Sequence, residues 1–446
     1  MHLMSKHWNT AFSVISWLCA YLMLVLAPLF VLLIGNIPSG SGFWWDFSIA
    51  LGFTGMAMMG VQFLLTARFR RVTAPFGIDI IYYFHRYLAI MAVSFLFLHL
   101  IILKINHPEA LGTINPLQAP LYMTAGRLAL LFFSLMIISS LWRKQLHIHY
   151  DEWRLLHISL AVSAFLLALG HIEGVGYYTG APAKFWLWSG YTLIWVTLIV
   201  YIRLLKPWAI YKRPYRVSEV RQERGQSWTL TMTPDGHKAM KFKPGQFAWL
   251  TLKTSPWRIK EHPFSISCSA EINNRLEFTI KELGDFTRTI KDTQIGDIAF
   301  VDGPYGIFTV DQYTHAKGFV FIAGGVGSAP IVSMLRTLAD RNDQRPLVFI
   351  CANNYWEDVL FREELETLKT RLNLNLIHVI KYPHDNWVGE AGFITEELLS
   401  RVLPDSDQPY EYFLCGPKLM SDCIQHALHS FKIPLSKIHF ELFDMV

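Results

Sequence analysis

Two apolar stretches of the chain each carry a pair of histidines fourteen residues apart, His85 with His99 and His157 with His171. An α-helix turns about 100° and rises about 1.5 Å per residue, so each pair comes within roughly 40° of four full turns and shares one face, about 21 Å apart. An iron porphyrin is held by axial imidazole nitrogens. Two such helices side by side therefore predict two stacked hemes, each ligated from both sides.

Other interpretations of these histidines fit less well. A lone histidine on an apolar helix is usually a hydrogen-bonded core residue, but ionisable groups at membrane depth are rare and tend to be functional, and here one spacing occurs twice. Zinc helices carry histidines at i and i+4, and di-iron bundles carry Glu-x-x-His; these segments contain neither. The chain has no Cys-x-x-Cys-His motif for covalent attachment, so b-type heme is the natural expectation.

The elements that carry these histidines belong to a membrane domain. Six apolar runs are long enough, or nearly so, to cross a hydrocarbon core of about 30 Å. They cover residues 11–34, 44–66, 80–105, 122–142, 153–172 and 185–205. The first run lacks a convincing signal-peptide cleavage site, so we expect it to be retained as a helix.

Basic residues indicate how this domain is oriented. They gather after the second, fourth and sixth runs, at Arg68, Arg70, Arg71, Arg143, Lys144, Arg154, Arg203, Lys206, Lys212, Arg213 and Arg216. The positive-inside rule then places both chain ends in the cytoplasm of a six-pass protein of a bacterial inner membrane or plasma membrane. His85 and His157 share the inner level, and His99 and His171 share the outer one.

Charge and cysteine usage exclude other classes. The formal net charge of +5 is explained by these membrane-anchoring residues, and no basic cluster with interleaved aromatic residues suggests a nucleic-acid partner. The five cysteines are scattered. Four of them lie in the predicted cytoplasmic half, where we expect free thiols.

Beyond Pro214 the pattern changes to that of a water-soluble protein. Short alternating runs at 228–232, 247–252, 276–280 and 298–301 predict a small antiparallel barrel. From about residue 317, a strand (318–323), a helix (331–341) and a strand (346–351) predict a parallel sheet that binds its ligand at the carboxyl edge.

Two turns follow strands of this parallel sheet. The turn Gly324-Gly325-Val326-Gly327 lets the backbone approach a pyrophosphate, whose charge is favoured at the N-terminus of the next helix. A later strand, 412–414, runs into Cys415-Gly416-Pro417. Its position predicts a thiol at the same sheet edge.

The order of motifs resembles the ferredoxin-NADP reductase-type flavin module. The motifs are His262-Pro263-Phe264-Ser265-Ile266-Ser267, Lys281-Glu282-Leu283-Gly284-Asp285-Phe286-Thr287, Gly303-Pro304-Tyr305-Gly306, the glycine turn and Cys415-Gly416-Pro417. Joined to six helices with two bis-histidine pairs, the chain resembles the family of NADPH oxidases and transmembrane ferric reductases. We expect an all-α transmembrane bis-heme domain (1–210), an antiparallel β-barrel FAD domain (211–314) and an α/β parallel-sheet NAD(P)-binding domain (315–446).

The resemblance implies roles for individual residues. His262, Pro263, Phe264 and Ser265 would lie along the flavin ring, with Ser265 near the position that accepts hydride. Cys415 and Phe443 would complete the catalytic group, Phe443 as an aromatic cover of the ring, although ordinary core packing is the alternative for Phe443. The remaining implied FAD- or nucleotide-binding residues are Ser267, Lys281, Gly284, Thr287, Gly324, Gly325, Gly327, Gly416 and Pro417.

Heme propionates need cationic partners near the membrane surface. Arg86 and Arg154 are the candidates at the inner level, and Arg127 is the candidate at the outer level. All three could instead be interfacial anchors.

These parts predict outward electron transfer from NAD(P)H through FAD and the two hemes, because flavin takes two electrons and releases them singly. The acceptor would be oxygen, giving superoxide, or ferric iron, which His107 and Glu109 could attract if they are more than surface residues. The alternative is an electron-delivery subunit for a periplasmic redox protein or quinone; a protein partner is not identified by the sequence. A channel or voltage sensor would need regularly spaced arginines along one helix, and no segment has them.

The sequence favours NADH, or weak discrimination, over strict use of NADPH. A 2'-phosphate usually calls for Arg or Lys after the second strand of the nucleotide domain. This chain has Asn353-Asn354-Tyr355-Trp356 there, and Arg362 follows in a predicted helix.

Overall fold

The structure, a computed structural model, describes residues 2–69 except 34–41, and residues 77–441 except 259, 406 and 407. The chain divides into two compact units, Met1–Pro207 and Trp208–Val446. Each unit is described by itself. The predicted boundary after residue 210 lies three residues beyond this division.

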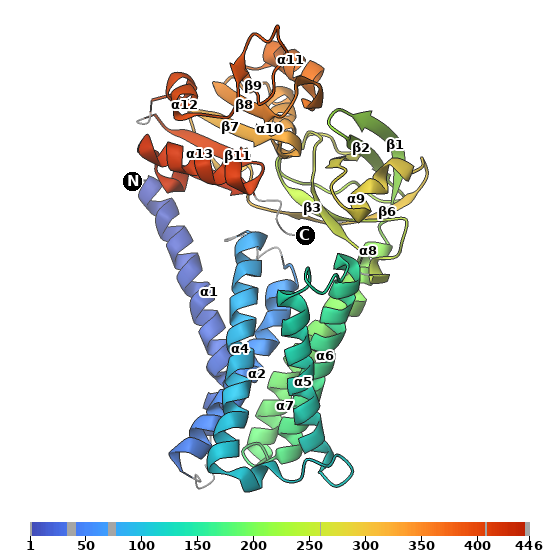
Figure 1. The fold of residues 1–446 in the computed structure, drawn as a ribbon, viewed down its shortest axis with the longest axis vertical. Helices are drawn as coiled ribbons and strands as arrows, with labels where there is room; N and C mark the ends of the chain where they lie inside the picture. Colours follow the sequence, from blue (N-terminus) through green and yellow to red (C-terminus); the bar gives the residue numbers. More distant parts are fainter. Residues whose placement is uncertain (1, 34–41, 70–76, 259, 406–407, 442–446) are drawn as a thin grey trace. The chain divides into compact units, whose positions relative to one another are not determined.

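The first unit is a bundle of six long helices (Figure 1). They are α1 (His2–Leu33), α2 (Phe43–Thr66), α4 (Ile78–Asn106), α5 (Leu121–Leu141), α6 (Tyr150–Val175) and α7 (Pro182–Val200). All six are long and apolar enough to cross a membrane, which confirms the predicted spans. Proline defines two of the helix starts, because Pro120 precedes α5 and Pro182 opens α7, where its missing N–H costs nothing.

Two antiparallel helix pairs make up the centre of this bundle. α2 packs along α4, and α5 packs along α6. α2 is the most buried span, and its Met56, Met58 and Met59 join Phe133 and Phe165 in one hydrophobic cluster. The bundle therefore has a tightly packed interior, whereas the outward faces of the other helices expose large apolar side chains of the kind that face lipid.

The last membrane-length helix continues beyond residue 205, where its predicted apolar run ends. After Val200 the helix passes through a π-helical turn, Tyr201–Leu205, into α8 (Lys206–Tyr211). π-helical turns inside α-helices occur frequently at functional sites.

The second unit begins with a six-stranded antiparallel sheet in the order β4-β3-β6-β1-β2-β5. Its strands are β1 (Tyr215–Glu223), β2 (Ser227–Pro234), β3 (Phe247–Leu252), β4 (His262–Ser265), β5 (Leu276–Lys281) and β6 (Ile298–Tyr305). The four strands predicted from alternation correspond to β2, β3, β5 and β6. Alternate residues such as Leu230, Leu250 and Phe278 point into one buried core.

The chain continues into a second six-stranded sheet, in the order β10-β9-β8-β7-β11-β12 with parallel pairing. The strands are β7 (Gly318–Gly324), β8 (Leu347–Asn353), β9 (Leu374–Ile380), β10 (Glu390–Ala391), β11 (Tyr410–Cys415) and β12 (Ile438–Glu441). The fold class predicted from the sequence is thus confirmed.

Helices cover both faces of this parallel sheet. α10 (Ser328–Asp340) and α11 (Arg362–Arg371) pack on the face that contains Phe319, Phe321 and Phe349. α12 (Glu396–Val402) and α13 (Lys418–Ser430) pack on the opposite face. Burial on both faces explains why β7 and β8 are almost continuously apolar.

Candidate functional site

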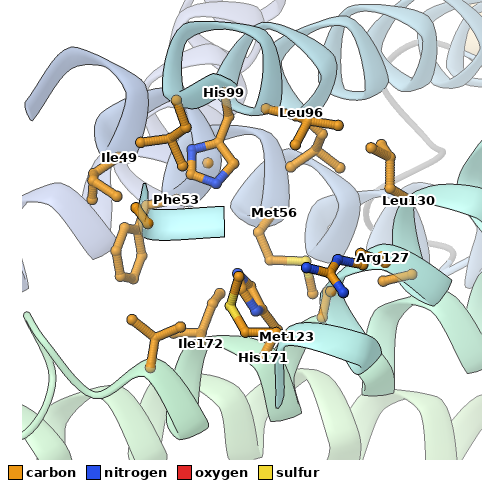
Figure 2. Close-up of a pocket in the computed structure, with 18 of the residues that line it drawn as sticks. Ile49, Phe53, Met56, Leu96, His99, Met123, Arg127, Leu130, His171 and Ile172 are labelled. Atoms are coloured by element: carbon orange, nitrogen blue, oxygen red, sulfur yellow. The ribbon is translucent and has the colours of Figure 1, made fainter. Parts of the chain in front are cut away.

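The outer pair of predicted ligands, His99 on α4 and His171 on α6, lines a single cavity of about 230 Å³ within the first unit. Figure 2 shows the two side chains on opposite sides of it. Most of the other lining residues are apolar, among them Ile49, Phe53, Met56, Leu96, Met123, Leu130, Phe133 and Ile172. An apolar cavity with an imidazole on each side matches the surface and the two axial ligands of a heme.

Hydrogen bonds orient these two imidazole rings. Nδ1 of His99 donates to the backbone carbonyl of Ser48 at 2.9 Å, and Nδ1 of His171 donates to the backbone carbonyl of Tyr122 at 3.0 Å. Metal-ligating histidines characteristically use one ring nitrogen in this way, which fixes the tautomer and leaves the other nitrogen for the metal. The outer pair therefore fits a heme iron.

Two glycines make room for the same rings. A Cβ atom at Gly52 would lie 3.2 Å from Nδ1 of His99, and one at Gly126 would lie 2.7 Å from Nδ1 of His171. Gly52 on α2 and Gly126 on α5 both line the cavity. Neither was identified from the sequence, because nothing in the spacing of the histidines shows which residues of the neighbouring helices face them.

The inner pair, His85 and His157, brings its ring centroids to 6.2 Å. A metal lies about 2 Å from an imidazole nitrogen, and each centroid lies about 1 Å behind that nitrogen, so two rings on one iron are expected about 6 Å apart. The inner pair therefore also fits a bis-histidine iron site. Nδ1 of His157 bonds to the hydroxyl of Ser140 at 3.1 Å.

The three arginines predicted to bind propionates occupy different environments. Arg127 lines the outer cavity and donates to the carbonyls of Leu111 at 2.6 Å and Ile114 at 3.4 Å. Arg154 is half-buried and Arg86 is exposed. Arg203, in the π-helical turn, interacts electrostatically with His157; the sequence had marked it only as a membrane anchor. A propionate role stays a prediction for the first three.

In the second unit, the residues expected along the flavin ring form strand β4. β4 pairs with β3, so that Ser265 lies opposite Phe247. Ser265 is buried, and its hydroxyl has no hydrogen-bond partner among the described residues. The ring of His262 stacks on Phe286 at 4.0 Å. A buried hydroxyl without a protein partner is what a hydrogen bond to a bound ligand would satisfy, so Ser265 fits its expected role.

The residues expected to hold the rest of FAD are partly engaged within the protein. Ser267 is fully buried and accepts a hydrogen bond from Thr279 at 3.1 Å. The hydroxyl of Thr287 accepts from the backbone N–H of Gly284 at 2.8 Å and shapes the turn after β5. Lys281 ends β5. Their contacts with FAD stay predictions.

The two predicted turns do meet at the carboxyl edge of the parallel sheet. Cys415 lies opposite Ala323 in the register of β11 and β7. A Cβ atom on Gly327 would come 2.2 Å from the carbonyl oxygen of Cys415, so only glycine allows this approach. Cys415 is fully buried. Gly324, Gly325, Gly416 and Pro417 belong to the same two turns.

Sequence reasoning missed an acidic residue at this edge. Glu441 ends β12, lies opposite Cys415 in the strand register and is buried. Phe443, the expected aromatic cover of the flavin ring, lies outside the described residues.

Near the nucleotide edge, Arg362 is engaged with neighbouring side chains. Its guanidinium lies 4.6 Å over the ring of Trp356 and pairs with Glu363 at 3.1 Å. Glu363 also pairs with Arg224 at 2.5 Å. Backbone hydrogen bonding at the start of α11, followed by these arginines, lowers the pKa of Glu363 to about 2.

Three family profiles match consecutive parts of the chain. Residues 51–169 match "Ferric reductase like transmembrane component", residues 220–309 match "FAD-binding domain", and residues 321–426 match "Oxidoreductase NAD-binding domain". The first match contains His85, His99 and His157, the second contains β4 with Ser265, and the third contains the glycine turn and Cys415.

Individual relatives match over shorter stretches. The glycine betaine monooxygenase reductase subunit of Pseudomonas aeruginosa is 28% identical over 242 residues, which is 53% of this chain and 65% of that protein. NADH-cytochrome b5 reductase 1 of Laccaria bicolor is 33% identical over 178 residues, 39% of this chain and 58% of that protein. The chain thus spans less than two thirds of the length of these relatives.

Among solved structures, the FAD/NAD-binding domain of a nitric oxide dioxygenase from Vibrio cholerae is similar, with 20% identity and a TM-score of 0.46. The match covers 52% of this chain and 98% of the chain of that domain. The decisive comparison is the order of the three family matches, the first within the membrane-length helices and the other two after them. The chain thus has the domain architecture of the ferric reductase and NADPH oxidase type of membrane oxidoreductase.

Proposed function

We propose that the protein carries electrons from cytoplasmic NAD(P)H, through FAD and two b-type hemes, to an acceptor on the other side of the membrane. When bound, FAD converts the two-electron chemistry of nicotinamide into the single electrons that a heme accepts. The proposal combines the oxidoreductase architecture with the two histidine levels in the membrane unit.

One observation carries the proposal. Two helices, α4 and α6, each present a histidine at two levels, and the rings pair between the helices, His99 with His171 around one cavity and His85 with His157 at 6.2 Å. A histidine kept only for core packing needs no partner ring from another helix. In three of the four rings, those of His99, His157 and His171, Nδ1 is hydrogen-bonded elsewhere, which leaves the other nitrogen for iron.

The membrane unit contributes a dry environment as well as ligands. Phe53, Met56 and Phe133 line the outer cavity and exclude water from the iron that we place there. His99 and His171 would both be engaged as ligands of that iron, and such a heme would supply electron transfer rather than chemistry at the metal.

The second unit contributes the nucleotide site. The glycine turn brings backbone close to the expected pyrophosphate at the start of α10. Ser265 on β4 and Cys415 at the sheet edge would orient the nicotinamide against the flavin ring. The buried Glu441 beside Cys415 is available to hold or move a proton.

The direction of transfer rests on the distribution of basic residues, which favours a cytoplasmic second unit. Oxygen or ferric iron is the proposed acceptor. The alternative, delivery of electrons to a partner protein, is supported by relatives such as the reductase subunit of glycine betaine monooxygenase, whose name describes a subunit of a larger enzyme.

The test is spectroscopy and turnover of the purified full chain in detergent or vesicles. We expect a low-spin b-type spectrum, two hemes per chain, and reduction of both hemes by NADH under anaerobic conditions. Superoxide release and ferric-chelate reduction measured side by side identify the acceptor. A colourless protein after expression with ample heme would overturn the proposal, and turnover only with a partner protein would favour the delivery alternative.

A further inference from the structure

The last membrane-length helix ends in exposed aromatic side chains. The span extends from Pro182 to Tyr211, and in its final part, α8, Trp208 is 51% exposed and Tyr211 is 52% exposed. Trp and Tyr are enriched where a membrane span meets the headgroups, because their rings are apolar and also carry a polar group. Side chains of the second unit that pack against Tyr211 are therefore expected at the same level of the membrane.

The antiparallel sheet of the second unit packs against Tyr211 through two elements. The Tyr211 ring stacks on Phe300 of β6, with the ring centroids 5.7 Å apart. It also lies 5.3 Å from the ring of Trp257, which belongs to the short helix η3 (Pro256–Arg258) between β3 and β4. Phe300 and Ile298 alternate with the core residue Ala299, so both lie on the outer face of β6.

Large apolar side chains remain exposed around this contact. Trp257 is 40% exposed and Ile298 is 42% exposed, and together with Trp208 and Tyr211 they form what we call the apolar patch. Exposed patches of this kind mark surfaces that bind a partner or a membrane. The sequence did not show the patch, because η3 and β6 meet Tyr211 only in the folded unit.

Exposed cations accompany the apolar patch. Lys212, Arg213 and Arg258 are exposed, and Nζ of Lys212 lies 4.3 Å over the ring of Trp208. Within the described part of the chain, none of these three cations forms an ion pair with a carboxylate. Lys253 near the same loop differs, because it pairs with Asp297 at 3.4 Å. The patch therefore combines aromatic rings with positive charge that the described residues do not neutralise.

We propose that the apolar patch, with Lys212, Arg213 and Arg258, binds the headgroup layer of an anionic phospholipid membrane. Aromatic rings settle at the headgroup level, and basic residues next to a span attract anionic lipids. Continuity with the last span favours lipid over a protein partner, and the core of a protein interface is poor in charged residues. The surface needs no heme, flavin or nucleotide, so it is independent of the proposed function.

The experiment uses the full chain in lipid nanodiscs, with a bimane fluorophore on one added cysteine. Thr254→Cys places the fluorophore in the loop after β3 and keeps both Trp257 and Arg258. Cys19→Ser and Cys423→Ser remove the exposed native thiols, and buried thiols react slowly. The quencher is a phosphatidylcholine with a nitroxide on its headgroup, which acts only at short range.

Thr370→Cys on α11 is the control position and is exposed. α8 precedes the start of β1, whereas Arg224, just after β1, pairs with Glu363 of α11, so α11 lies at the opposite end of this strand. In discs of phosphatidylcholine with phosphatidylglycerol, we expect several-fold stronger quenching at Thr254→Cys than at Thr370→Cys. Equal quenching at the two positions would overturn the proposal. Weak quenching at Thr254→Cys with two chains per disc would assign the surface to a second copy of this chain instead.

A charge variant tests the cations without disturbing packed side chains. In Thr254→Cys, phosphatidylglycerol should increase quenching over discs of phosphatidylcholine alone, and Lys212→Gln with Arg258→Gln should remove most of that increase. Lys369→Gln with Arg371→Gln on α11 removes the same charge from exposed positions and should keep the increase. No increase with phosphatidylglycerol, or an equal loss in both double variants, would show that these cations do not bind anionic lipid. Heme-free protein gives the same readout, so failure of the proposed function does not affect this test.

Discussion

A Cβ atom on Gly126 would lie 2.7 Å from Nδ1 of His171, closer than side-chain carbons approach other heavy atoms. Gly126→Ala therefore has to displace the ring, and overpacking of this kind costs about 1–3 kcal/mol. We expect the variant to lose most of its outer heme and to keep the inner one. Heme content per chain, read from the visible spectrum, measures this.

Gly52→Ala provides the comparison at the equivalent position of the other helix pair. Its Cβ atom would lie 3.2 Å from Nδ1 of His99, a distance that a shift of a few tenths of an ångström relieves. This variant should retain clearly more heme than Gly126→Ala. Equal retention in both would show that the glycines do not act through the histidine rings.

Flavin reduction should be independent of the membrane ligands. In His99→Ala the second unit is unchanged, so the rate of flavin reduction by NADH, followed anaerobically by stopped flow, is expected to stay within about twofold of the parent, well under the tenfold that 1.36 kcal/mol represents. Transfer to ferric chelates or oxygen should fall by at least tenfold. Normal transfer in a variant with one heme would contradict the serial arrangement of the two levels.

The spacing of the histidines predicted the membrane site because the helix period alone decides which residues share a face. It could not identify the partners of these residues. Tyr122 acts through its backbone carbonyl, which carries no side-chain signature. Ser48, whose carbonyl and hydroxyl both contact Nδ1 of His99, and Ser140 look like any other serine of an apolar helix. These contacts depend on the register between helices, which side-chain periodicity leaves open.

In the second unit, the apolar runs predicted the strands that line the core, and the glycine turn predicted the nucleotide edge. Glu441 could not be identified from the sequence, because its burial depends on the pairing of β12 with β11. A four-residue strand of mixed polarity also has too little periodicity to be predicted. Arg362 was recognised as a cation, but its stacking on Trp356 and pairing with Glu363 depend on the loop after β8.

The hydroxyl of Ser265 is buried and has no hydrogen-bond partner in the part of the chain that the structure describes. If that hydroxyl bonds to the reacting flavin or nicotinamide, Ser265→Ala removes about 1 kcal/mol or more of stabilisation. We expect the rate of hydride transfer from NADH to fall at least several-fold, with FAD content and heme content unchanged. Stopped-flow reduction of the flavin measures the rate, and Ser269→Ala, another buried serine of this unit, is the control.

The cysteines should differ sharply in reactivity. Burial raises the pKa of the Cys268 thiol to about 12 and also raises that of Cys351, and the thiolate is the reactive form. At pH 8, iodoacetamide should therefore modify the exposed Cys423 in the folded protein and reach Cys268 and Cys351 only after unfolding. Peptide mass spectrometry reads out each site. Early modification of Cys268 would contradict its burial in the barrel.

The pairing of Arg362 with Glu363 predicts the nicotinamide preference. Because the guanidinium is occupied by Glu363 and Trp356, we expect a higher kcat/KM for NADH than for NADPH. Glu363→Gln removes the carboxylate that pairs with Arg362 and should raise kcat/KM for NADPH several-fold with little change for NADH. Adding Arg362→Ala to this variant should abolish the gain.

The pKa of Glu363 is lowered to about 2, so its carboxylate is charged at every pH well above that value and loses its charge only as the pH falls through it. Titration of Glu363 should therefore contribute nothing to the pH dependence of the preference above about pH 5, where the titrating group is the 2'-phosphate monoester, whose second pKa is about 6. A preference for NADPH in the parent would mean that other residues bind the 2'-phosphate. The same conclusion would follow if the increase in kcat/KM for NADPH in Glu363→Gln persisted when Arg362→Ala was added.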